Sequence, residues 1–121
     1  MIERRVCRSD NQSAALRYQL ESTLKRGNMA AIALADRCGL LVASAGEEAV
    51  CLELGAVAPM VVHGWPSELA ATAEIPADQV SVRAIECFGE KLFLASLGGG
   101  TACDALLAHS ARGIHRILTA N

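Results

Sequence analysis

The sequence MAAIALADRCGLLVASAG, residues 29–46, contains two apolar runs separated by a short polar segment. Met29 to Ala35 is apolar at both alternating positions, which is typical of a strand that is covered on both faces. Asp36-Arg37-Cys38-Gly39 predicts a reverse turn, with Gly39 supplying the positive φ that a tight hairpin needs. Leu40 to Ala43 is then the returning strand. The stretch predicts a β-hairpin whose first strand is central in a sheet, with Asp36 and Gly39 as its structural turn residues.

A helix is expected before this hairpin, from about Asn11 to Arg26. Leu16, Leu20 and Leu24 recur at intervals of four residues and form one narrow apolar stripe on it. Gly27 follows the last turn, where a glycine commonly ends a helix. The helix should therefore contact the rest of the domain along one edge.

A second helix is expected after the hairpin, from Glu47 at least to Val57, and Pro59 leaves open whether it continues to Val62. It is apolar almost all round, so it must be covered on more than one side. One apolar row contains Ala49, Leu52, Ala56 and Met60, and the other contains Val50, Leu54, Val57 and Val61. We expect one face to rest on the sheet and the Val50, Leu54, Val57 and Val61 row to form a homodimer interface.

The second half of the chain predicts a further hairpin and a last helix. Val80 to Cys87 alternates like a half-exposed strand, Gly89-Glu90 marks a turn, and Leu92 to Leu97 is a strand apolar on both faces. Glu68 to Ile75 is a candidate for a short edge strand. An amphipathic helix follows Thr101. The expected order along the chain is a helix, two strands, a helix, two or three strands and a helix. This order predicts an α/β fold, a three-layer α/β/α sandwich around a mostly antiparallel sheet.

Composition limits the class of protein. A length of 121 residues, with 52% hydrophobic and 20% charged residues, indicates one globular domain spanning residues 1–121. A net charge of −2 gives no basis for nucleic-acid binding. The charged amino-terminal segment lacks the apolar core of a signal peptide, and no stretch is long enough for membrane insertion. These features predict a cytoplasmic protein.

No chemical motif indicates catalysis, a cofactor or a metal. Five cysteines occur without a close pair, so four of them are interpreted as small buried side chains. His109 and His115 lie six residues apart on the charged arc of the last helix and are interpreted as solvated. Gly98-Gly99-Gly100 lacks the residues of either phosphate-binding motif and is interpreted as a hinge. No nucleophile, base and orienting group occur together, which predicts a protein that is not an enzyme.

Three segments in order resemble the roadblock/dynein light chain domain family, as in bacterial single-domain members. They are Ala35–Gly46, Val82–Gly98 and Gly113–Leu118. The resemblance implies a profilin-like fold with a five-stranded antiparallel sheet. Along the chain, its helices and strands would follow the order α-β-β-α-β-β-β-α. It implies the middle helix on one face and the first and last helices on the other. It also implies homodimers or heterodimers in which the two middle helices pack together and edge strands continue the sheet.

Members of this family are non-enzymatic scaffolds and regulators of small Ras-like GTPases. The resemblance therefore implies a dimeric adaptor or regulator whose partners are a second copy of itself and a small Ras-like GTPase. The alternative is a dimeric sensory or scaffold module that has no GTPase partner and holds a small ligand. The sequence departs from the family pattern at Pro59 and between Leu69 and Ala73, where the dimer surface is expected.

Overall fold

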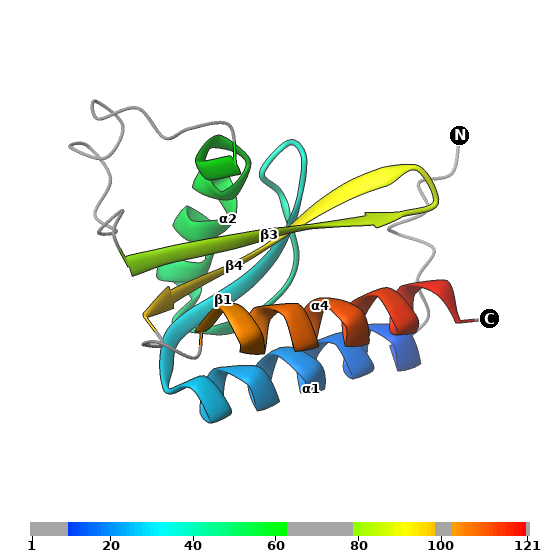
Figure 1. Ribbon diagram of the computed structural model, residues 1–121, viewed down its shortest axis with the longest axis horizontal. Coiled ribbons are helices and arrows are strands. Elements are labelled where there is room, and N and C mark those ends of the chain that lie inside the picture. The colour runs from blue at the N-terminus through cyan, green and yellow to red at the C-terminus, as the bar shows by residue number, and fades with distance from the viewer. Residues whose placement is uncertain (1–9, 63–78, 99–102, 121) are drawn as a thin grey trace.

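In the described part of the chain four antiparallel strands form one sheet, in the order β2 (Leu41–Gly46), β1 (Met29–Asp36), β4 (Glu90–Gly98) and β3 (Val80–Cys87) (Figure 1). The computed structural model describes residues 10–62, 79–98 and 103–120. Within them the elements are α1 (Asp10–Gly27), β1 (Met29–Asp36), β2 (Leu41–Gly46), α2 (Glu48–Val62), β3 (Val80–Cys87), β4 (Glu90–Gly98) and α4 (Cys103–Thr119). The prediction that β1 is central is confirmed, because it pairs with β2 on one side and β4 on the other.

Three helices cover the two faces of the sheet. Figure 1 shows α1 and α4 side by side across one face, with α2 on the other. Because side chains alternate along a strand, Ile32 and Leu34 of β1 point into the core beneath α1 and α4. Ala31 and Ala33 point into a second core beneath α2. The expected three-layer α/β/α arrangement is confirmed for this part of the chain.

The hairpin turn between β1 and β2 is built as predicted. Asp36 accepts hydrogen bonds through its side-chain Oδ1 from the backbone N–H of Cys38 at 2.8 Å and of Leu40 at 3.1 Å. Its backbone carbonyl accepts one from Gly39 N–H at 2.9 Å. Gly39 has φ +86°, a conformation that glycine adopts without steric strain. Asp36 and Gly39 therefore have the structural roles expected of them.

Two element boundaries differ from the prediction. The first helix includes Gly27, and the left-handed residue that ends it is Asn28, with φ 51°. A Cβ at Gly27 would lie 2.8 Å from Met29 Cε and 2.9 Å from Leu106 Cδ1, the ends of two flexible side chains, so this glycine is closely packed. The β2 strand continues to Gly46, because Ala45 and Gly46 pair with β1 before the chain turns into α2.

Pro59 lies inside α2, which continues to Val62. The predicted second hairpin is confirmed as β3 and β4. The candidate strand Glu68–Ile75 falls outside the described residues, as does Thr101, the residue after which the last helix is expected. The sheet thus has four strands in the described part, and a fifth remains a prediction.

None of the helices in the described segments is long and apolar enough to cross a membrane.

Candidate interaction surface

The inner face of α2 packs on small side chains of β1. Leu54 is fully buried there, together with Cys51 and Ala58, in the same core as Ala31 and Ala33. Gly55 also lies on this face, and a Cβ on it would come within 2.7 Å of Leu41 Cδ2. The alanines and the glycine let the helix approach the sheet closely.

The predicted dimer residues are therefore only partly available to a partner. Leu54 has 0% and Val57 has 8% of its surface exposed, so the expectation that they are exposed in a monomer is wrong. Val50 and Val61 are half-buried at the edges of the helix. Both rows of α2 are apolar in the sequence. The row that contains Leu54 packs against the small residues of β1, and the other row does not.

The other row faces outward. Leu52 is 54% exposed and Met60 is 41% exposed, while Ala49 and Ala56 are also exposed. We call Ala49, Leu52, Ala56 and Met60 the outer α2 row. These residues recur at intervals of three or four, so they form a continuous apolar stripe on one helix face. This stripe is the candidate interaction surface.

The β1–β2 turn supports this stripe at Ala56. A Cβ placed on Gly39 would lie 3.2 Å from the Ala56 Cα, so the turn backbone rests directly against the helix. Leu40, the next residue in the chain, is 63% exposed. Gly39 thus both forms the turn and allows its contact with α2.

The cysteines have structural surroundings. Cys51 Sγ donates to the backbone carbonyl of Ala45 at 3.2 Å, and burial raises the pKa of its thiol. Burial, and then the charge of Glu90, also raise the pKa of Cys87. Cys103 is buried with its Sγ 3.1 Å from Ser96 Oγ. A raised pKa favours the protonated, unreactive thiol, so Cys51 and Cys87 act as core side chains. The buried Cys103 also acts as a core side chain, through its packing. Cys38, in contrast, is exposed.

The histidines of α4 are exposed, as predicted for His109 and His115. Across residues 10–62, 79–98 and 103–120, no three His, Cys, Asp or Glu side chains are grouped so that they could hold a metal ion.

The described strands form an antiparallel sheet with α2 on one face and α1 and α4 on the other. Two solved structures share this fold. Myxococcus xanthus MglB superposes with a TM-score of 0.63 and 14% identity, covering 94% of this chain and 97% of MglB. A structure described as MglB with a tetrameric arrangement gives a TM-score of 0.62 and 15% identity, covering 92% and 93%. No family profile and no curated protein sequence matches the chain.

At these identities the similarity to MglB concerns the fold. The resemblance to the roadblock family, first suggested by three short motifs, is confirmed at that level by a superposition that spans nearly the whole chain.

Proposed function

We propose that this chain is a non-enzymatic adaptor or regulator that works as a self-associated pair and acts on a small Ras-like GTPase. Two observations support the class of function. The fold is that of MglB, and the hairpin motifs resemble those of roadblock-domain regulators. One of the two similar structures is of MglB in a tetrameric arrangement, so self-association accompanies this fold in that protein.

The observation that carries the proposal is the outer α2 row. Leu52 and Met60 are large apolar side chains with about half of their surface in water. Full burial of such a side chain contributes about 1.5–3 kcal/mol. A two-fold interface uses each residue twice, so four large side chains lose water when two copies of the helix meet. This gain is set against the entropy lost on association.

The half-buried Val50 and Val61 lie at the edges of α2 and can extend this contact. Leu54 and Val57 instead hold the helix on the sheet. We therefore infer that self-association uses the outer α2 row in place of the row of Val50, Leu54, Val57 and Val61 that the sequence suggested.

Leu52→Glu is expected to raise the dimer dissociation constant by about a hundredfold or more, because the carboxylate is buried twice and meets its own copy. Sedimentation velocity at micromolar concentration measures this change. Ala105→Glu is the matched control, since it adds the same charge at an exposed position of α4. A wild-type chain that sediments as a monomer, or a dimer insensitive to Leu52→Glu, would contradict the assignment.

The GTPase partner is tested separately. We expect the wild-type chain to bind a small Ras-like GTPase from the same genome with different affinities for its GDP form and its form loaded with a non-hydrolysable GTP analogue. Isothermal titration calorimetry with each purified GTPase, in both nucleotide states, measures the two affinities. Self-association without binding to any of these GTPases would favour a scaffold module without a GTPase partner.

A further inference from the structure

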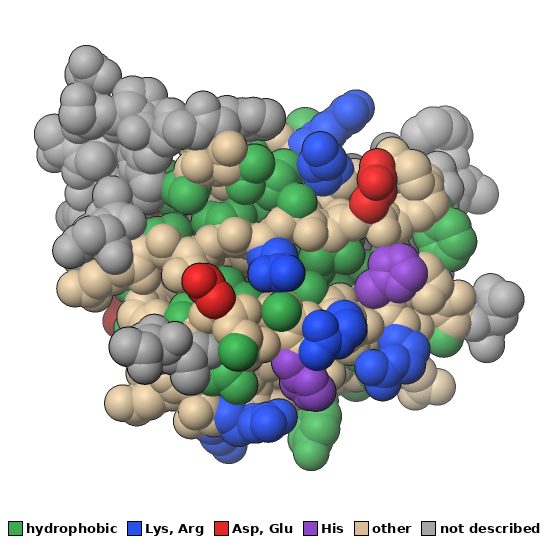
Figure 2. Space-filling view, in the orientation of Figure 1, with side chains coloured by type: hydrophobic (Ala, Val, Ile, Leu, Met, Phe, Trp, Pro, Cys, Tyr) green, Lys and Arg blue, Asp and Glu red, His purple; other side chains and the backbone are tan. Residues whose placement is uncertain are grey.

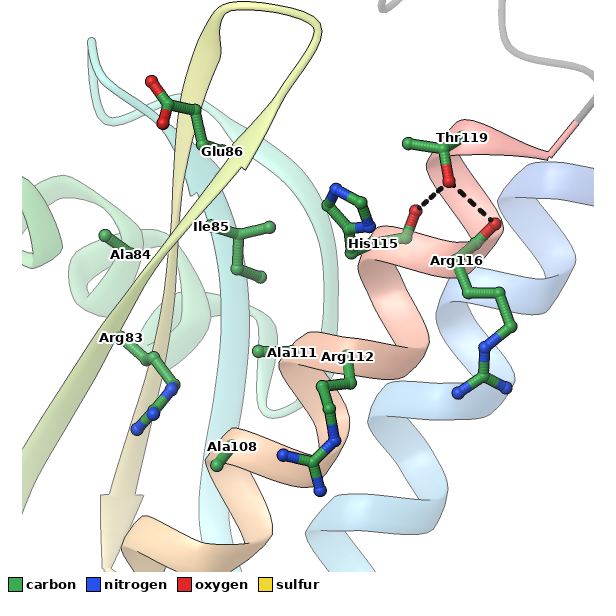
Figure 3. Close-up of a pocket in the computed structure, with 10 residues that line it drawn as sticks. All are labelled: Arg83, Ala84, Ile85, Glu86, Ala108, Ala111, Arg112, His115, Arg116 and Thr119. Atoms are coloured by element: carbon green, nitrogen blue, oxygen red, sulfur yellow. Dashed lines mark hydrogen bonds between the residues drawn. The ribbon is translucent and has the colours of Figure 1, made fainter.

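A second surface lies on the opposite side of the sheet from α2. A groove of about 580 Å³ runs between β3 and α4 (Figure 3). Ile85, Ala108 and Ala111 are among its apolar lining residues, and Arg83, Arg112 and His115 are among its cationic or titratable ones. Ile85 is buried, whereas Arg83, Arg112 and His115 are exposed.

The side chains of Arg83 and Arg112 define one end of this groove. Figure 3 shows both extending toward the same end, from β3 and from α4, with Ala108 between them. His115 lies toward the other end, near Ile85, while Arg116 points away toward α1. Arg83 and Arg112, which come from elements distant in sequence, therefore lie at the same end of the groove, beside the small side chain of Ala108.

These cations are not neutralised within the described part of the chain. No ion pair joins the guanidinium of Arg83 or Arg112 to a carboxylate among residues 10–62, 79–98 and 103–120. Of the described residues that line the groove, Glu86 is the only acidic one, and Figure 3 shows it at the far end from Arg83. The whole chain has a net charge of −2, and Figure 2 shows Lys and Arg side chains at several places on this face, with Asp and Glu side chains among them. Two like charges that share a groove repel each other, and an anionic occupant would relieve that repulsion.

We propose that the groove between β3 and α4 binds an acidic, extended segment of a partner protein. Carboxylates of the segment would pair with Arg83 and Arg112, and its small apolar side chains would lie over Ala108 and Ala111. Guanidinium groups pair with carboxylates through two parallel hydrogen bonds, which adds geometric selectivity to the charge attraction.

Other anionic partners fit this surface less well. Among the described residues no Phe, Tyr or Trp lines the groove, so the imidazole of His115 is the one aromatic ring there on which a nucleic-acid base could stack. None of the large exposed apolar residues of the described chain lines it either, and a membrane surface would be expected to engage such residues. An extended protein segment fits this groove better, because its carboxylates can pair with the two arginines while its small side chains lie over Ala108 and Ala111.

The groove is separate from the outer α2 row, because the sheet lies between α4 and α2. A self-associated pair would therefore present two grooves with its α2 contact intact. Binding of the acidic segment requires neither the GTPase nor self-association.

Fluorescence anisotropy with a short fluorescein-labelled polyglutamate peptide tests the proposal. The wild-type chain is expected to bind the peptide, with affinity falling as salt is raised from about 50 to about 500 mM. The variant Arg83→Glu/Arg112→Glu is expected to raise the Kd by about tenfold or more. Arg83→Lys/Arg112→Lys keeps both charges but removes the paired hydrogen bonds of the guanidinium groups, so it is expected to raise the Kd by about threefold, less than the charge reversal does.

The matched control is Arg17→Glu/Arg37→Glu, which makes the same change of charge at exposed positions outside the groove. All substituted residues are exposed, so circular dichroism should report the same fold for each variant. Equal loss of affinity in the control, or no peptide binding by the wild type, would overturn the proposal. Tighter binding of an oligonucleotide or of anionic phospholipid vesicles than of the peptide would also overturn it. Leu52→Glu should leave peptide binding unchanged, which separates this test from that of self-association.

Discussion

Leu54→Glu is expected to unfold the domain, with a loss of more than about 4 kcal/mol in the free energy of unfolding. Leu54 has no exposed surface and packs in the core between α2 and the sheet. A glutamate there would bury a charge that has no ionic partner among the apolar side chains of this core. Burying an unpaired charge is among the most destabilising changes a substitution can make. Because small domains are stable by only about 5–15 kcal/mol, a loss of this size would remove a large share of the stability.

Urea denaturation followed by circular dichroism measures this effect, and Leu52→Glu is the matched comparison. The two residues lie two positions apart on the same helix, but Leu52 is 54% exposed. Leu52→Glu should therefore stay folded while it loses self-association. A folded, monomeric Leu54→Glu protein would show that Leu54 faces outward, as the sequence pattern alone suggested.

Gly46→Ala is expected to destabilise the domain by about 3 kcal/mol or more, through backbone strain and a backbone clash together. Gly46 ends β2 with φ +111°, a conformation that residues with a side chain rarely adopt. A Cβ on it would lie 2.9 Å from the Ala30 carbonyl oxygen and 3.0 Å from the Ala31 Cα. Neither atom can move without disturbing the pairing of β1 with β2.

Gly89→Ala separates these two contributions. Gly89 has φ +77°, but a Cβ on it would meet no atom within 4 Å. Its substitution should cost about 1 kcal/mol, from the conformational preference alone. Denaturation midpoints of the two variants give the comparison, and equal losses would show that the contact of Gly46 with β1 is unimportant.

The hairpin could be predicted from sequence because its determinants are local. Its first strand is apolar at every position from Met29 to Ala35, and Asp36 and Gly39 are suited to the turn by their own chemistry. The first and last helices could be predicted for a similar reason, since each has a single apolar stripe.

The orientation of α2 could not be predicted in this way. Both of its rows are apolar, so its helical pattern does not distinguish the inner face from the outer one. The distinction comes from Gly55 and from the alanines of β1, which lie about twenty residues away in sequence and leave space for Leu54. Only the packed structure brings these residues together.

The groove between β3 and α4 could not be predicted from the sequence either. Arg83 belongs to a strand and Arg112 to a helix, and either arginine alone is an ordinary exposed residue. Their common position depends on how α4 crosses the sheet beside β3, which no local pattern specifies.

The alanines of β1 have a mechanical consequence for the surface of the protein. They fix the spacing between the helix and the sheet, because methyl groups are the only β1 side chains beneath Leu54 and Gly55. A larger side chain at Ala33 would overpack this core, and a backbone shift of α2 that relieved the overpacking would displace the outer α2 row. The buried alanines of β1 therefore influence the position of the outer α2 row on the surface of the protein. The shape that a partner meets is determined by the interior of the protein as much as by the side chains it touches.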